Sequence, residues 1–159
     1  MILMALASLR VLAQEKVQLE EVFKNSYTLE NNAEYSKAIE ALKKVYDESS
    51  YEINLRLGWL TYQAGWFTES TAFYNKSIQL MPMSVEARLG FVLPAAALGN
   101  WNQVINRYNE ALKIDPNHYT VNYRLGMIYY NRQEYQTAYK YRSEEHTLNS
   151  SHGKFSRMP

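Results

Sequence analysis

The sequence predicts an all-α fold built from helical hairpins stacked along the chain. Apolar side chains recur at steps of three and four in several segments, which places them on one face of an α-helix. The same order of large and small residues returns about 34 residues later, and such a period marks a repeated structural unit. Only 6 Gly and 4 Pro occur in 159 residues, too few turn formers for a many-stranded sandwich or barrel.

The composition fits one soluble globular unit and excludes several classes of function. Apolar residues make up 47% of the chain and charged residues 21%. Lys and Arg total 17 against 16 Asp and Glu, so the net charge of +1 gives no field that attracts a nucleic acid or an anionic membrane. The chain has no cysteine, which excludes disulfides, thiolate nucleophiles and zinc sites that need sulfur.

The first 18 residues contain an apolar run, Met1 to Ala13, with two readings. Ser8 and Arg10 interrupt the run, and it is too short and too polar to span a bilayer, so no transmembrane segment is expected. As a signal peptide it predicts an exported or periplasmic protein, although no positive charge precedes it. As a first helix that packs on the next one it predicts a cytoplasmic protein. Both readings remain open.

A stripe of large and small residues identifies the second helix of each hairpin. The copy in the third unit consists of Trp101, Val104, Ile105, Tyr108, Ala111 and Leu112. The copy before it consists of Phe67, Ser70, Thr71, Tyr74, Ser77 and Ile78. The earliest consists of Tyr35, Ala38, Ile39, Leu42, Val45 and Tyr46.

A first helix precedes each stripe. The expected ranges are 20–31, 52–63, 86–98 and 121–132. Gly65 and Gly99 stand where the chain turns between the helices of a hairpin and can adopt positive φ. Pro82 and Pro116 follow the second helices, where a missing amide hydrogen stops propagation.

These hairpins resemble the tetratricopeptide repeat family. The resemblance rests on Leu57, Gly58, Gly65, Phe67, Ser70, Tyr74, Ser77 and Pro82; on Gly99, Trp101, Val104, Tyr108, Ala111, Asp115 and Pro116; and on Leu125, Gly126, Tyr129, Tyr135 and Ala138. It implies a right-handed α-solenoid over residues 19–141, divided into a degenerate unit 19–50, units 51–84 and 85–118, and an incomplete unit 119–141. The first unit departs from the pattern, with Asn25-Ser26 in place of Leu-Gly and no closing proline.

The third unit departs differently. Its Leu89-Gly90 pair comes two residues early, and Pro94 falls inside the first helix, four residues after Gly90. Gly90 and Pro94 together predict a kink that changes the curvature of the array, or a silent kink that the stack tolerates.

The fourth stripe begins with Tyr135, Ala138 and Tyr139 and stops after Tyr141. From Arg142 onward the sequence resembles the translation of a common sequencing-library adapter. We therefore expect residues 142–159 to be a non-native tail and the native C-terminal repeats to be missing.

No residues form a catalytic pattern, and no cofactor or metal site is expected, so the chain is predicted not to be an enzyme. His118, between Asn117 and the fourth unit, is expected to be a solvated loop histidine. Asp115 beside Pro116 is interpreted as a turn and cap element. A Gly-rich phosphate loop and a nucleophile elbow are both missing from the sequence.

The resemblance implies that first-helix side chains line the inner surface of the array. The candidate protein-binding groove consists of Leu55, Trp59, Tyr62, Leu89, Leu93, Tyr123, Met127 and Tyr130. Family members that clamp a terminal carboxylate carry Lys, Arg and Asn at several of these positions, so the apolar strip disfavours that ligand. The alternative is that these side chains pack against neighbouring helices or against a missing C-terminal segment.

The sequence thus predicts a noncatalytic scaffold that binds a protein or peptide partner in an apolar and aromatic groove. One alternative is the recognition domain of a longer enzyme, such as a transferase or kinase. Another is an exported assembly factor.

Overall fold

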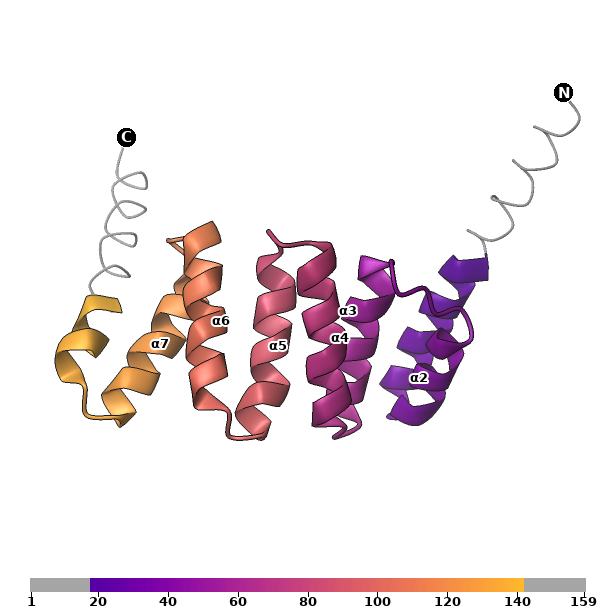
Figure 1. Cartoon of the computed structure of the whole chain (residues 1–159). Coiled ribbons are helices and arrows are strands. Elements are labelled where there is room, and N and C mark those ends of the chain that lie inside the picture. Colours follow the sequence, from indigo (N-terminus) through magenta and orange to yellow (C-terminus); the bar gives the residue numbers. More distant parts are fainter. Residues whose placement is uncertain (1–17, 142–159) are drawn as a thin grey trace, which may run out of the picture. The chain divides into compact units, whose positions relative to one another are not determined.

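A computed structural model describes residues 18–141, and every regular element in that range is a helix. The elements are α2 (Tyr35–Lys43), α3 (Tyr51–Gln63), α4 (Phe67–Leu80), α5 (Val85–Ala97), α6 (Trp101–Ile114) and α7 (Tyr119–Asn131) (Figure 1). Residues 18–31 and 135–141 are helical as well. The predictions for residues 1–17 and for the tail 142–159 lie outside the described residues.

The chain divides into two compact units, with the boundary between residues 81 and 82. Unit 1 holds the helix 18–31 with α2, α3 and α4, and its α3 packs against both α2 and α4. Unit 2 holds α5, α6, α7 and the helix 135–141, and its α6 packs against both α5 and α7. Each unit therefore contains two helical hairpins, as the stripes predict.

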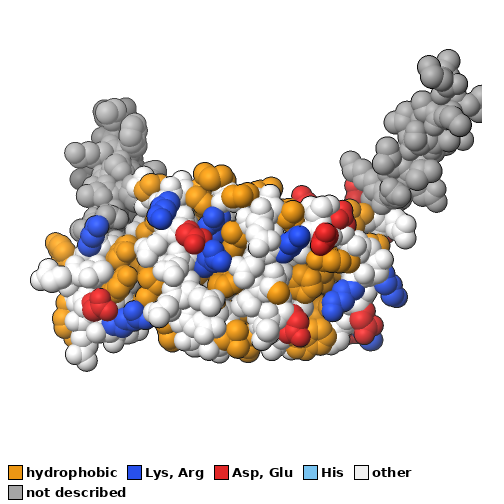
Figure 2. All heavy atoms as spheres, in the orientation of Figure 1, with side chains coloured by type: hydrophobic (Ala, Val, Ile, Leu, Met, Phe, Trp, Pro, Cys, Tyr) orange, Lys and Arg blue, Asp and Glu red, His pale blue; other side chains and the backbone are white. Residues whose placement is uncertain are grey.

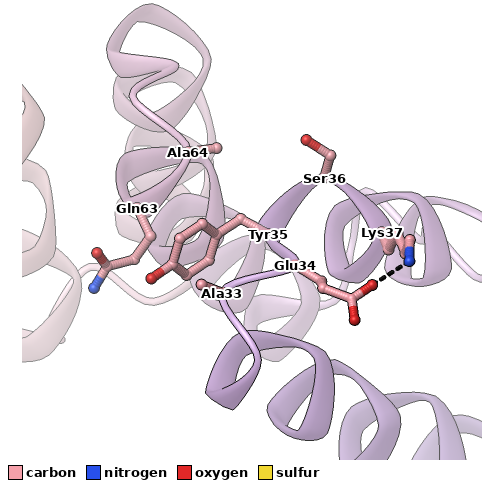
Figure 3. A pocket seen from close by; sticks show the side chains of 7 residues that line it. All are labelled: Ala33, Glu34, Tyr35, Ser36, Lys37, Gln63 and Ala64. Atoms are coloured by element: carbon pink, nitrogen blue, oxygen red, sulfur yellow. Dashed lines mark ion pairs between the residues drawn. The ribbon is translucent and has the colours of Figure 1, made fainter.

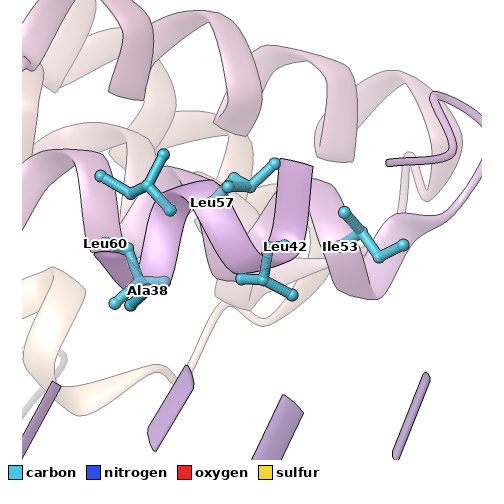
Figure 4. Packing of buried hydrophobic residues seen from close by; sticks show 6 residues of the cluster. Ala38, Leu42, Ile53, Leu57 and Leu60 are labelled. Atoms are coloured by element: carbon cyan, nitrogen blue, oxygen red, sulfur yellow. The ribbon is translucent and has the colours of Figure 1, made fainter. Parts of the chain in front are cut away.

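One cluster of buried apolar residues in unit 1 comes from α2 and α3 (Figure 4). Its members are Ala38, Ile39, Leu42, Ile53, Leu57 and Leu60. Leu19, Val22, Phe23 and Leu29 of the helix 18–31 pack on this cluster, together with Trp59 and Phe73. Burial of these side chains at about 25 cal/mol per Å² of apolar surface is the main force that holds the hairpins together.

The first helices of successive repeats begin with a capping side chain at the same repeat position. Ser50 accepts a hydrogen bond from the Ile53 amide (3.3 Å), and Ser84 accepts one from the Ala87 amide (3.0 Å). His118 occupies the equivalent place, and its Nδ1 accepts from the Val121 amide at 3.4 Å. His118 lies in the loop before α7, as predicted, but it is half-buried, and its imidazole nitrogen satisfies one of the free amides at the start of α7.

The turn inside each hairpin requires a left-handed residue. Gly65 and Gly99 have φ of 78° and 73°, which confirms their predicted role. Ala33 and Gln133 hold the corresponding position in the other two hairpins with φ of 58° and 62°. In all four hairpins the next amide reaches back to a carbonyl in the last turn of the preceding helix, as Trp66 N does to Thr61 O (2.8 Å).

The second helix of the first repeat is shorter than its stripe predicts. It ends at Lys43, so Val45 and Tyr46 lie in the following turn. The Asp47 carboxylate accepts hydrogen bonds from the amide and hydroxyl of Ser49, a local turn that competes with helix. Tyr46 folds back and donates to Asn54 Oδ1 at 3.1 Å.

The early Leu89-Gly90 pair does not shift the third repeat. Because α3, α5 and α7 begin at residues 51, 85 and 119, Val92 holds the repeat position of Gly58 and Gly126. The helix α5 continues through the buried Pro94, whose carbonyl accepts from the Leu98 amide at 3.0 Å.

Candidate protein-binding surface

In unit 1 the three candidate residues lie on α3, and two of them belong to a row of aromatic rings. Leu55, Trp59 and Tyr62 are all half-buried. The rings of Trp59 and Tyr62 have centroids 6.0 Å apart, and Tyr62 lies 5.8 Å from Phe67 of α4. Trp59 also packs on the apolar cluster of the unit. In this unit the candidate residues therefore serve packing as well as lining a surface.

A carboxylate that sequence reasoning missed holds Trp59 in place. Glu30 accepts a hydrogen bond from Trp59 Nε1 (2.5 Å) on one oxygen and pairs with Arg56 Nη1 (2.6 Å) through the other. The Arg56 guanidinium lies 3.8 Å from the ring centroid of Tyr27, and its Nε donates to Ser26 Oγ (3.1 Å). Arg56 is only 7% exposed, so this is a desolvated ion pair with further hydrogen bonds.

The same cluster explains why the first repeat departs from Leu-Gly. Ser26 is fully buried at the small-residue position, and its hydroxyl donates to Phe23 O (2.7 Å) while it accepts from Arg56. A hydroxyl is small enough for this place and gives Arg56 a partner. The only sequence signals were a serine and an arginine 30 residues apart, which no helical period connects.

In unit 2 the candidate residues are more exposed. Leu89 of α5 is half-buried, whereas Leu93 is exposed. One face of α7 carries an exposed row that we term the aromatic stripe: Tyr119, Tyr123, Met127 and Tyr130. Tyr119 and Tyr123 stack with centroids 6.4 Å apart, and Tyr130 meets Tyr135 edge-on at 5.5 Å. Steps of four, four and three keep the stripe on one side of the helix.

The opposite face of α7 belongs to the core of unit 2. Val121 and Leu125 are fully buried, and Asn122 donates through its side-chain amide to Pro116 O at 3.1 Å. On the neighbouring pair of helices, Glu110 of α6 accepts from Arg107 (2.9 Å) and lies 3.3 Å from Arg88 Nε of α5. The framework that carries the stripe is therefore fixed by packing and by ion pairs.

Unit 1 also contains an open depression of about 500 Å³ at the turn before α2 (Figure 3). Its lining consists of Ala33, Glu34, Tyr35, Ser36, Lys37, Gln63 and Ala64. Lys37 pairs with Glu34 at its edge, and this carboxylate raises the pKa of the lysine. The two charged side chains that line the depression therefore pair with each other.

Perturbed pKa values occur away from the stripe and have structural causes. Burial raises the pKa of the Tyr108 hydroxyl. Hydrogen bonds from Ser49 lower the pKa of Asp47. Within residues 18–141, His, Asp and Glu side chains form no group of three that suits a metal ion.

Positive and negative side chains are interspersed with hydrophobic ones on the face seen in Figure 2.

Comparison with known proteins assigns the repeat. Residues 96–133 match the family model described as TPR repeat. These residues, from the end of α5 to the turn after α7, thus match a tetratricopeptide repeat. The fold of the chain resembles the crystal structure of MamA, with a TM-score of 0.76 and 22% identity over 91% of this chain and 86% of that one. It also resembles a tetratricopeptide repeat protein from Parabacteroides merdae, with a TM-score of 0.76 and 21% identity over 84% of this chain and 54% of that one.

Two further proteins are similar to parts of this chain. YrrB, described as a tetratricopeptide repeat protein with an unusual peptide-binding site, has a TM-score of 0.65 and 15% identity over 84% of this chain and 73% of its own. The serine/threonine-protein kinase mTor of Drosophila melanogaster is 27% identical over 86 residues, which are 54% of this chain and 3% of the kinase. The predicted all-α solenoid class is confirmed. Among the described helices, none is long and apolar enough to cross a membrane.

Proposed function

We propose that this tetratricopeptide repeat protein is a noncatalytic scaffold that binds a peptide or helical segment of a partner protein. The observation that carries the proposal is the aromatic stripe of α7. Tyr123 is 46% exposed and Tyr130 59%, although the same helix buries its other face. Tyr and Met are enriched at protein interfaces because large, amphipathic or adaptable side chains gain much contact area there.

The division of roles between the units follows from their contacts. Trp59 is held by Glu30 and by the core, so its removal is expected to destabilise unit 1. Tyr123 contacts Tyr119 within its own helix and leaves much of its ring in solvent. Of the candidates, Leu93, Tyr123, Met127 and Tyr130 are therefore proposed as binding residues, with Leu55, Trp59, Tyr62 and Leu89 as partly buried support.

Little supports the alternative of a recognition domain in a longer enzyme. The similarity to the kinase covers 3% of that protein, so it does not favour an enzyme of that type. The described residues place no His, Asp or Glu in a metal-binding group, and the buried ion pairs already described connect helices.

Selection from a phage-displayed library of random dodecapeptides against the full chain tests the proposal. Selected peptides should bind in a fluorescence anisotropy titration, and Tyr123→Ala should weaken them by about tenfold or more, as removal of an interface tyrosine does. Tyr139→Ala is the matched control, because Tyr139 is an exposed tyrosine of the same unit, 70% accessible, outside the stripe. Both variants should keep the helical circular dichroism of the parent.

Two results would contradict the proposal. One is a library that yields no binding peptide. The other is a set of selected peptides that bind the Tyr123 and Tyr139 variants equally well. Trp59→Ala, measured in parallel, distinguishes a residue that supports the fold from one that contacts the peptide. Because Trp59 supports unit 1, this variant should have a lower unfolding midpoint than the parent.

A further inference from the structure

Arg124 holds the same repeat position as Arg56, but the two guanidinium groups have different surroundings. Each arginine is the sixth residue of its helix, since α3 begins at residue 51 and α7 at residue 119. Arg56 is buried and paired with Glu30. Arg124 is exposed and has no carboxylate partner within the described residues, and α7 itself contains neither Asp nor Glu.

The preceding first helix explains the difference. Glu30 is the second-last residue of the helix 18–31 and comes five residues before α2 begins at Tyr35. Ala96 is the second-last residue of α5 and comes five residues before α6 begins at Trp101. Leu93 corresponds to Tyr27 in the same way, because each lies three residues before Ala96 or Glu30. Unit 2 thus has a methyl group and an isobutyl group where unit 1 has a carboxylate and an aromatic ring.

The neighbourhood of Arg124 combines charge with apolar surface. Arg124 follows Tyr123 directly and lies one turn before Met127, so it borders the aromatic stripe. Burial raises the pKa of the Tyr108 hydroxyl on α6, and the positive charge of Arg124 acts in the opposite direction. An exposed guanidinium beside apolar side chains can form a charged hydrogen bond that a partner would shield from water.

We propose that Arg124 binds an aspartate or glutamate side chain of the partner peptide, in the position that Glu30 occupies toward Arg56 in unit 1. Apolar side chains next to that acidic residue contact Leu93, Tyr123 and Met127. The ligand is therefore an acidic and apolar peptide segment. This inference rests on the proposed function and specifies the chemistry of the partner.

The peptides selected from the dodecapeptide library test the inference directly. They should be enriched in Asp or Glu next to large apolar residues. Arg124→Glu and Arg124→Gln should weaken their binding by about tenfold or more, the effect of losing a charged hydrogen bond. Arg132→Glu is the matched control, because it makes the same charge change at an exposed arginine just beyond the end of α7.

Failure of this inference is distinguishable from failure of the proposed function. Peptides that depend on Tyr123 but bind Arg124→Glu normally, or that show no enrichment in acidic residues, would overturn the inference alone. A library that yields no binding peptide would overturn both. An equal loss in Arg132→Glu would also overturn the inference, because it would indicate a general effect of net charge.

A second variant tests the comparison between the units. Ala96→Glu introduces a carboxylate at the position that corresponds to Glu30. It should pair with Arg124 and lower the affinity for the selected peptides by about tenfold, whereas Ala96→Gln, of similar size and without charge, should have a much smaller effect. Equal losses in the two variants would contradict the assignment of Arg124 as the carboxylate-binding residue.

Discussion

Replacement of Gly58 by alanine places a methyl group against the ring of Tyr74. A Cβ built on Gly58 lies 3.0 Å from Cγ, Cδ1 and Cδ2 of that ring, whereas carbon atoms in favourable contact are about 3.5–4.0 Å apart. Tyr74 is 3% exposed, and a hydrogen bond from Ser70 Oγ to Gly58 O (2.7 Å) holds α4 against α3. The ring must therefore retreat within a packed interior.

The change in the free energy of unfolding on Gly58→Ala is the sum of two opposing effects. Alanine gains about 1 kcal/mol over glycine inside a helix, and overpacking of a core costs about 1–3 kcal/mol. Gly58→Ala should therefore change the free energy of unfolding by between about 0 and −2 kcal/mol. Gly126→Ala is the matched control, because its added Cβ finds its nearest neighbours at 3.6 and 3.7 Å, an ordinary contact distance. That variant should gain about 1 kcal/mol.

Urea unfolding followed by circular dichroism at the helical minimum measures both variants. The predicted order of unfolding midpoints is Gly126→Ala above the parent, with Gly58→Ala at or below it. An equal rise of the midpoint in both variants would refute the reasoning that the Gly58–Tyr74 contact requires a residue without a side chain.

Three further predictions concern single contacts, and each is checked by the same unfolding measurement. Ala33→Gly should stabilise the protein by about 1 kcal/mol because it relieves a left-handed alanine, and Gly99→Ala should destabilise it by a similar amount; equal effects of one sign would contradict this. His118→Ser should preserve the start of α7, whereas His118→Ala should lower stability by about 0.5–2 kcal/mol, and equal stability of the two variants would show that the cap contributes nothing. Glu30→Ala should destabilise unit 1 by about 3 kcal/mol because it leaves Arg56 buried without its partner, and Glu30→Ala combined with Arg56→Met should recover part of that loss; a double variant no more stable than the single one would argue against the ion pair.

The periodic features of the fold were predictable from the sequence, since they depend on residues close along the chain. The spacing of the stripes gave the hairpins, and Gly65 and Gly99 marked two of the turns. The end of α2 was not predictable from hydrophobic periodicity, because the Asp47 turn overrides it locally. Ser84 and Gly99 fix the first helix of the third repeat between cap and turn, so its register does not depend on the early Leu89-Gly90 pair.

The site was predictable only as a set of positions on first helices. The family resemblance placed Trp59 and Tyr123 on equivalent faces but gave no information on what each contacts. The pairing of Glu30 with Arg56 and Trp59 joins helices that are distant in sequence, so it follows from tertiary packing alone. That pairing is why Trp59 is half-buried while the stripe of α7 is exposed.

Hydrogen–deuterium exchange of the full chain, with and without a saturating selected peptide, tests the central claim most directly. The claim is that α7 presents the partner-binding surface. Added peptide should slow amide exchange most strongly in Tyr119–Asn131 and leave exchange in α3 and α4 nearly unchanged. Protection confined to unit 1, with no change in α7, would contradict it.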